Sequence, residues 1–86
     1  KGLLKMKTKE KVYEILKALS CKDKIGDRDR LREDLMLDSL AMVILLIETE
    51  DKLGIRFDEA DMNPFDLVTS GDVVRLAKKY AGDLHE

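Results

Sequence analysis

The chain has 86 residues, of which 44% are hydrophobic and 40% are charged, and its formal net charge is −2. This balance is typical of one soluble helical domain with an aliphatic core, and it argues against a disordered chain. A bilayer span needs about 20 apolar residues, and the longest apolar run, 40–47, is far shorter. The first residues lack the apolar region and cleavage site of a secretory signal. We therefore expect one domain over 1–86, located in the cytoplasm, with no membrane partner.

The charge is unevenly distributed along the chain. Residues 1–32 carry 11 lysines and arginines against 5 acidic residues, whereas residues 33–86 carry 5 against 13. An acidic half favours partners with basic docking surfaces, although such an excess can simply solvate a helix face. The basic third has no stacking surface and the remainder is acidic, so no nucleic-acid binding is expected.

Cys21 is the only cysteine and His85, in the tail, is the only histidine. A single cysteine excludes an intrachain disulfide and fits a reducing compartment, and we interpret Cys21 as a small buried hydrophobic residue. One histidine and no Gly-rich phosphate loop leave little from which to build a catalytic or metal site. The chain is therefore not expected to be an enzyme.

The first predicted helix begins near Thr8, after a lead-in over 1–7 that we expect to be partly frayed, and ends near 20–22. Its apolar positions have the spacing of one helix face: Val12, Ile15, Leu16 and Leu19. A connection over 21–38 follows, and loops of this length are often functional. Its apolar residues could hold it to the core: Ile25, Leu31 and Leu35. Its alternating Asp-Arg-Asp-Arg is expected to be solvated surface, because the spacing of a calcium loop is absent.

Asp38 and Ser39 mark the start of the second predicted helix, which spans 39–53 and stops at Gly54. Asp38 is a good N-cap, because its carboxylate can accept a hydrogen bond from an otherwise unpaired backbone N–H. The Ser39 hydroxyl would then lie at the positive end of the helix dipole, which is a favourable place for a phosphate ester. On local chemistry alone, the alternative that both residues only cap the helix stays open.

The apolar residues of this helix fall on two nearly opposite faces when they are placed about 100° apart. One face comprises Met42, Leu45, Leu46, Thr49 and Leu53. The other comprises Leu40, Val43, Ile44 and Ile47, and it passes on to Asp51. So small a domain has few elements to cover both faces. We therefore expect the second face to be exposed for a partner, beginning beside Ser39.

Shorter elements complete the predicted bundle. Residues 55–57 are an extended connection that returns Ile55 or Phe57 to the core, and Asp58 caps a short helix over about 59–63, before Pro64. Thr69 opens a capping-box pattern, and a last helix over 70–81 follows. Its inner face is predicted to hold Val73, Leu76, Ala77 and Tyr80. The pattern predicts an all-α bundle of three main helices and one short helix, with a tail over 82–86.

With these elements in place, the chain resembles the acyl carrier protein family over nearly its whole length. The Asp38-Ser39-Leu40 triplet is similar to the family's attachment motif, and its placement after a long loop makes the match specific. Four further stretches resemble the family's charged lead-in, the acidic end of its second helix, and the starts of its third and fourth helices. They are residues 32–35, 48–55, 57–61 and 68–74.

The resemblance implies that Ser39 accepts 4′-phosphopantetheine from coenzyme A, through a separate transferase that uses magnesium. Asp38 would help to position that metal during transfer. The arm's thiol would then carry acyl groups as thioesters to acyl-synthesising or acyl-transferring enzymes, in a specialised fatty-acid, polyketide or related lipid pathway. The length favours a free-standing carrier, although a domain excised from a larger synthase could look the same. We expect a monomer, and weak self-association through the apolar face of the second helix stays open. The predicted docking residues are Leu40, Val43, Ile44, Ile47, Asp51, Asp58 and Glu59.

Two departures from the family pattern bear on this interpretation. Met36 stands where members usually have glycine, so the loop before Ser39 is expected to differ. Ala41 and Ile44 replace acidic residues early in the second helix, which makes the expected docking surface more apolar. The alternative function is a small helical protein–protein interaction domain in which Ser39 is only part of a helix cap.

Overall fold

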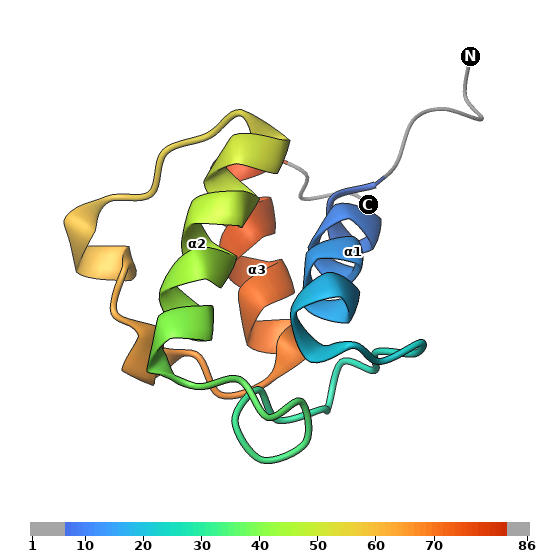
Figure 1. The fold of residues 1–86 in the computed structure, drawn as a ribbon. Helices are drawn as coiled ribbons and strands as arrows, with labels where there is room; N and C mark the ends of the chain where they lie inside the picture. The colour runs from blue at the N-terminus through green and yellow to red at the C-terminus, as the bar shows by residue number, and fades with distance from the viewer. Residues whose placement is uncertain (1–6, 83–86) are drawn as a thin grey trace.

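The structure is a computed structural model that describes residues 7–82. In this part of the chain, three α-helices pack side by side (Figure 1). The helices are α1 (Thr8–Ser20), α2 (Ser39–Leu53) and α3 (Ser70–Ala81). Two 3₁₀ turns, η2 (Glu59–Asp61) and η3 (Pro64–Asp66), interrupt the connection between α2 and α3. The predicted all-α bundle is therefore confirmed. The expected frayed lead-in, the tail and His85 lie outside the described residues, apart from Lys7 and Gly82.

The helix ends show why these residues form these elements. At the start of α1 the Lys7 backbone N–H donates to Glu10 Oε1 at 2.8 Å, and at the start of α3 Thr69 and Asp72 form a reciprocal capping box. Gly54 ends α2 with a φ of 66°, in the left-handed conformation that glycine adopts at little cost. The boundaries that the sequence predicts for all three main helices are confirmed.

The structure corrects the interpretation of Cys21. Its side chain is exposed, and its backbone takes a left-handed φ of 59° at the C-cap of α1. Its N–H donates to the Lys17 carbonyl at 2.9 Å, which closes the last turn. Cys21 lies one position beyond the helix, so it does not continue the buried face that Val12 and Leu16 define.

The short helix predicted over about 59–63 is present at the predicted start but is shorter than expected. It is a single 3₁₀ turn that ends at Asp61. Asn63 has φ −85° and ψ 107°, because the following Pro64 disfavours helical geometry there. The Asn63 side chain instead accepts a hydrogen bond from the Phe65 N–H at 3.0 Å, which begins the unpredicted turn η3.

The core is aliphatic and draws on every helix. Its most deeply buried residues include Val12 and Leu16 of α1, Met42 and Leu45 of α2, and Ala77 of α3, all 0% exposed. The three residues predicted to hold the long connection are buried as well: Ile25, Leu31 and Leu35. The connection between α1 and α2 is therefore part of the packed domain.

The same connection is held to the start of α3 through its backbone. Leu31 donates its N–H to the Val68 carbonyl at 2.8 Å, and the Asp29 carbonyl accepts from Ser70 at 2.9 Å. Gly71 donates to the Asp27 carbonyl at 2.9 Å, and a Cβ on Gly71 would lie only 3.1 Å from that oxygen. A side chain at this position would crowd the Asp27 carbonyl, so the connection would have to shift by a few tenths of an ångström to accept one.

The connection between α2 and α3 is tied down at its middle. Phe57 is 5% exposed and stacks edge-to-face on Tyr80 of α3, with 4.9 Å between ring centroids. The Tyr80 hydroxyl accepts from the Asp58 N–H at 3.1 Å and donates to Asp61. Phe57, predicted from its apolar position to return to the core, does so.

Between residues 7 and 82, no helix has the length and hydropathy that crossing a membrane requires. Over the same part of the chain, no three metal-ligating side chains of His, Cys, Asp or Glu gather in one place.

Candidate functional site

Asp38 is the N-cap of α2 and Ser39 is its first helical residue. The Asp38 backbone is extended, its Oδ1 accepts from the Ala41 N–H at 2.8 Å, and its carbonyl accepts from Met42 at 2.9 Å. Ser39 is exposed. Within residues 7–82, neither its hydroxyl nor the N–H groups of Ser39 and Leu40 have a hydrogen-bond partner.

The electrostatic environment of Ser39 suits an anion. The unpaired N–H groups and the dipole of α2 place positive charge at this end. The first turn of α2 contains no acidic residue, so Asp38 is the one carboxylate at the cap. A phosphate ester fits a hydroxyl in this position, because the site is open to solvent and offers backbone donors.

The loop before Ser39 contains one residue, Met36, with a left-handed backbone conformation. Glycine, which the family usually has at this position, would adopt that conformation easily. Met36 has a φ of 59° and is 78% exposed, whereas its neighbours Leu35 and Leu37 are 1% and 3% exposed. The Leu37 N–H donates to the Leu31 carbonyl at 2.9 Å. The left-handed step turns Met36 outward and lets both leucines reach the core. Met36 thus adopts a conformation that is strained for most residues other than glycine. The expected difference between this loop and that of other family members stays a prediction.

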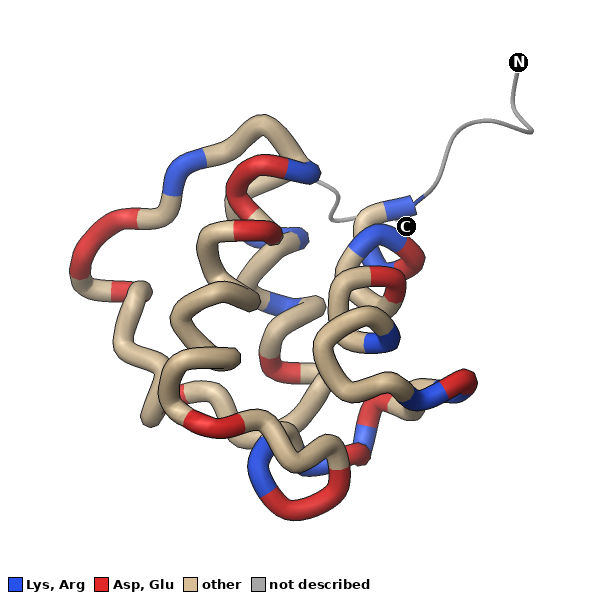
Figure 2. The backbone as a smooth tube through the Cα atoms, in the orientation of Figure 1, with Lys and Arg blue, Asp and Glu red and all other residues tan. Residues whose placement is uncertain are grey.

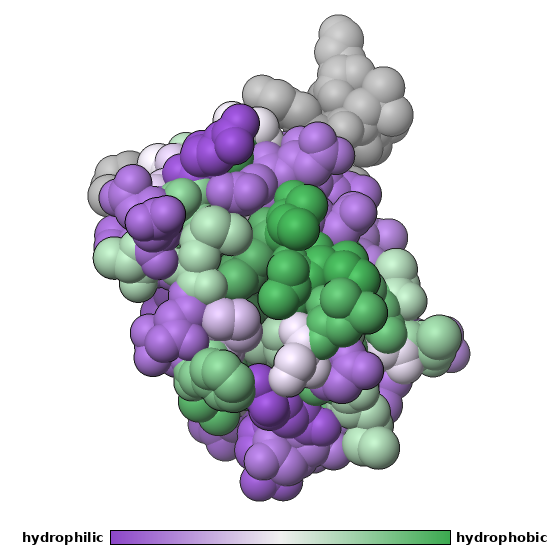
Figure 3. Space-filling view, turned by 60° about the vertical axis from the view of Figure 1, so that its left-hand side comes forward, coloured by the Kyte–Doolittle hydropathy of each residue, from purple (hydrophilic) through white to green (hydrophobic). Residues whose placement is uncertain are grey.

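One face of α2 is apolar and exposed, as the two-face pattern predicts. Its residues lie along the helix from beside Ser39: Leu40 (69% exposed), Val43 (43%), Ile44 (36%) and Ile47 (53%). These four residues are called the outer stripe below. The opposite face, from Met42 to Thr49, is buried. Figure 3 shows a contiguous hydrophobic area on the side of the molecule that carries α2.

Acidic residues lie beyond the outer stripe. Figure 2 shows them in the second half of α2 and around η2, while the first half of α2 carries no charge. Asp51 is exposed and lines an open depression of about 450 Å³ with Ile47, Gly54 and Arg56. Asp58 and Glu59 are exposed too, but they belong to the separate connection at η2.

The sequence pattern does not single out Arg32 or Phe65, which lie at the same end of the bundle as Ser39. The Arg32 Cζ lies 4.8 Å from the centroid of the Phe65 ring. Phe65 is 70% exposed, whereas the other phenylalanine, Phe57, is only 5% exposed. The contact between Arg32 and Phe65 joins two connections that are far apart in sequence, so no local motif signals it.

Comparison with known proteins adds a family and several relatives. The model of the phosphopantetheine attachment site matches residues 10–77. Over 47 residues the chain is 43% identical to the meromycolate extension acyl carrier proteins of Mycolicibacterium aurum and Mycobacterium tuberculosis. This match covers 55% of the chain and 46% and 39% of those two proteins, so the chain spans less than half their length. It is 29% identical over 84 residues to the acyl carrier protein of Thermotoga maritima, covering 90% of the chain and 100% of that protein.

Proposed function

Because this chain belongs to the phosphopantetheine-attachment family, we propose that it is an acyl carrier protein whose Ser39 bears the 4′-phosphopantetheine arm. The observation that carries the proposal is the exposed Ser39 hydroxyl at the first residue of α2, directly after the Asp38 cap. When bound, the arm supplies a terminal thiol that holds acyl groups as thioesters. The chain itself anchors and presents that thiol, and it catalyses no reaction.

Attachment uses the chemistry of a single hydroxyl. A separate transferase places coenzyme A beside Ser39, and the Ser39 Oγ attacks the phosphorus that bears the pantetheine. The new bond joins Oγ to phosphorus, the bond to 3′,5′-ADP breaks, and the hydroxyl proton passes to a base of the transferase. Asp38 Oδ1 is held by the Ala41 N–H. Oδ2 has no hydrogen bond within residues 7–82 and is left to help position the transferase's magnesium ion.

Intact-mass measurement tests the attachment. The purified chain is incubated with coenzyme A, magnesium and a promiscuous phosphopantetheinyl transferase, and one phosphopantetheine adduct is expected. Ser39→Ala should remain unmodified, whereas Ser20→Ala, which changes the other serine that is not buried, should load like the unmodified sequence. A chain that gains no adduct, or an adduct that survives Ser39→Ala, would support the alternative of a helical interaction domain.

The docking surface is proposed from the outer stripe together with Asp51, Asp58 and Glu59. The stripe begins one residue after Ser39, so a partner that receives the arm also meets this face. Its apolar start and acidic end fit enzymes that have an apolar patch beside a basic one. The mycobacterial relatives are named for meromycolate extension, which supports a specialised fatty-acid, polyketide or related lipid pathway. We also propose that the chain acts as a monomer in the cytoplasm.

A further inference from the structure

Arg32 and Phe65 form an exposed pair that the attachment reaction alone does not explain. Phe65 keeps 70% of its surface in contact with solvent, and its ring supports the Arg32 guanidinium at 4.8 Å. Two other arginines have carboxylate partners, since Arg30 lies 3.4 Å from Asp34 and Arg75 pairs with Asp72. Within residues 7–82, no carboxylate pairs with Arg32. Its charge is held in place by an aromatic ring, and its donors remain available.

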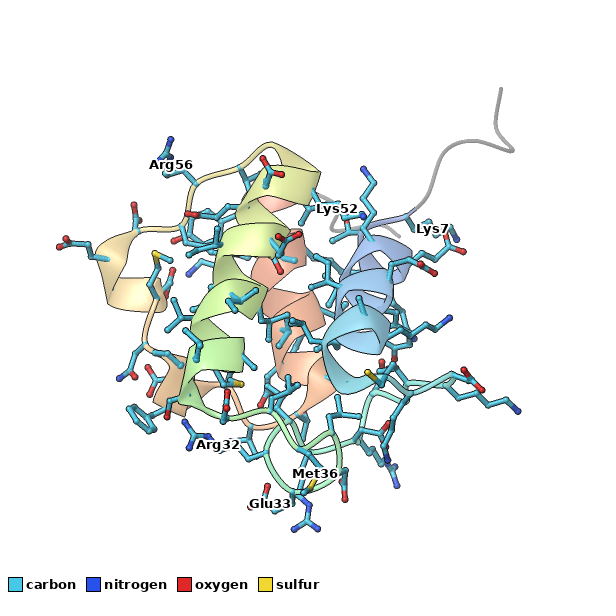
Figure 4. All side chains as sticks on the ribbon, in the orientation of Figure 1. Lys7, Arg32, Glu33, Met36, Lys52 and Arg56 are labelled. Carbon is cyan, nitrogen blue, oxygen red and sulfur yellow. The ribbon has the colours of Figure 1, made fainter. Side chains whose placement is uncertain are left out.

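The backbone places this pair near the start of α2, the helix that Ser39 begins. Leu31 is fixed on both sides, since its N–H donates to Val68 at 2.8 Å and its carbonyl accepts from Leu37 at 2.9 Å. Arg32 directly follows Leu31, and Leu31 is hydrogen-bonded to Leu37, the residue before Asp38. Phe65 belongs to η3, which packs against α2. Figure 4 shows the Arg32 side chain extending from the loop toward the first turn of α2, at the opposite end of that helix from Lys52 and Arg56.

We propose that Arg32, supported by Phe65, binds the phosphodiester that joins the arm to Ser39. The inference rests on the proposed modification of Ser39. A phosphodiester on Ser39 brings a second negative charge next to the carboxylate of the adjacent Asp38, and the two negative charges repel each other. A guanidinium offsets that repulsion, because its planar set of N–H donors matches two phosphate oxygens.

Phe65 makes this contact more effective by restricting Arg32 in advance. A cation over an aromatic face gains a modest attraction at an exposed site, and the ring also limits the rotamers of a long side chain. An ordered guanidinium loses less conformational freedom when it binds an anion. The pair would restrict the orientation of the phosphodiester at the start of α2.

NMR of the loaded protein tests the contact directly. After intact-mass measurement confirms loading, the Arg32 Nε–H cross-peak should move to higher proton frequency relative to the unloaded protein, while that of Arg56 stays in place. The phosphodiester ³¹P resonance should shift in Arg32→Gln and should shift less in Phe65→Leu. The matched control Arg56→Gln removes the same charge at the far end of α2 and should leave the ³¹P resonance unchanged.

The possible outcomes separate the two proposals. Complete loading with a stationary Arg32 cross-peak and identical ³¹P positions in all variants would overturn the role of Arg32 and leave the role of Ser39 standing. Equal ³¹P shifts in Arg32→Gln and Arg56→Gln would show only a long-range effect of charge and would also overturn it. A chain that cannot be loaded overturns both proposals. Amide spectra of the unloaded variants that overlay with the unmodified sequence exclude misfolding as the cause of any difference.

Discussion

Met36 has a backbone conformation that usually belongs to glycine. Its φ of 59° brings Cβ close to the following carbonyl, which costs about 1–2 kcal/mol for an L-residue. The surrounding structure holds it there, because Leu35 and Leu37 on either side are almost completely buried. The side chain itself is 78% exposed and contributes little burial to offset that cost.

Met36→Gly should therefore stabilise the fold. Relief of the left-handed strain exceeds the extra entropy that glycine gives the unfolded chain, so a net gain of up to about 1 kcal/mol in the free energy of unfolding is expected. Urea titrations of the unloaded protein measure it. Met36→Ala is the control, because alanine keeps the strained Cβ and should stay near the unmodified stability. A glycine variant less stable than the unmodified chain would mean that the methionine side chain makes a stabilising contact.

At this scale, local chemistry is predictable and contact between distant segments is not. The Asp38 cap follows from its position before an apolar run, because capping involves residues within one turn. The burial of Cys21 was wrongly inferred by continuing a helical face past the residue where the helix ends. Arg32 and Phe65 could not be paired from the sequence, since their contact depends on how two connections fold against each other.

At the scale of elements, α2 serves two surfaces at once. Its inner face, which includes Met42 and Leu46, is buried, while the outer stripe remains in solvent. Changes on the outer stripe should therefore affect binding without removing core contacts.

Ile44→Glu provides the test of docking. Ile44 is 36% exposed at the middle of the outer stripe, so a carboxylate there remains solvated in the free protein but opposes an apolar partner surface. We expect affinity for the native acyl-transferring enzyme to fall about tenfold, near 1.4 kcal/mol, with an unchanged unfolding midpoint. Ala18→Glu adds the same charge on an exposed position of α1 and should bind normally. Equal affinities for the two variants and the unmodified chain would remove the outer stripe from the docking surface.

Tyr80→Phe probes how the connection between α2 and α3 is held. The substitution keeps the ring against Phe57 but removes the hydroxyl that meets Asp58 and Asp61. Loss of these hydrogen bonds should cost about 1 kcal/mol, and hydrogen exchange should accelerate at the Asp58 amide. Exchange at the amide of the buried Thr49 in α2 serves as the internal reference. Unchanged protection at Asp58 would indicate that packing alone fixes η2.

Element boundaries are the most predictable part of the fold, and the reason is chemical. Thr69 and Gly54 are residues whose side chain, or lack of one, favours a helix end at that position. The short turns are less predictable, because η2 and η3 contain three residues each and little periodicity. Pro64 limits Asn63 to extended angles, but it does not specify the second turn that begins there.

At the scale of the whole molecule, carboxylates join the connections to the helices. The Tyr13 hydroxyl donates to Asp27, with Lys9 at 3.3 Å, and this holds the pKa of Asp27 below its usual range. Burial acts to raise the pKa of Asp72, but N–H donors from Thr69 and Val68 lower it overall. Burial and the Asp27 hydrogen bond together raise the pKa of Tyr13.

Acid should therefore destabilise the protein over a defined range. A carboxylate with a lowered folded-state pKa binds protons more weakly when folded, so the unfolded chain gains protons first as the pH falls. The full stabilisation is present above the ordinary aspartate pKa of 3.8 and is lost as the pH drops through the lowered folded-state values. Thermal unfolding midpoints should therefore decline as the pH falls through the ordinary aspartate pKa and below it.

Asp27→Asn supplies the comparison for this decline. The variant should have a lower thermal unfolding midpoint at neutral pH. Its midpoint should fall less on acidification, because the variant lacks one carboxylate whose pKa is lowered by folding. Glu14→Gln removes a carboxylate whose ion pair with Lys17 is exposed and 3.8 Å long, so its curve should follow that of the unmodified sequence. A parallel curve for Asp27→Asn would exclude Asp27 from the acid response.

The composition of the core is predictable at this scale, whereas its assembly depends on the structure. Periodicity identifies Val12, Leu45 and Val73 as buried positions, because helical spacing alone defines a face. The close approach of Gly71 to Asp27 involves segments separated by an entire helix, and only the folded arrangement shows that a side chain at Gly71 would crowd the Asp27 carbonyl.

The division of α2 into a buried face and an exposed face has a consequence for sequence change. Positions 40, 43, 44 and 47 can vary without disturbing the packing that holds the bundle together, whereas positions 42, 45, 46 and 49 cannot. If the outer stripe is the docking surface, as we propose, selection on partner choice and selection on folding act on separate residues of one helix. A library restricted to those four outer positions should yield well-folded variants that differ in which enzymes they serve.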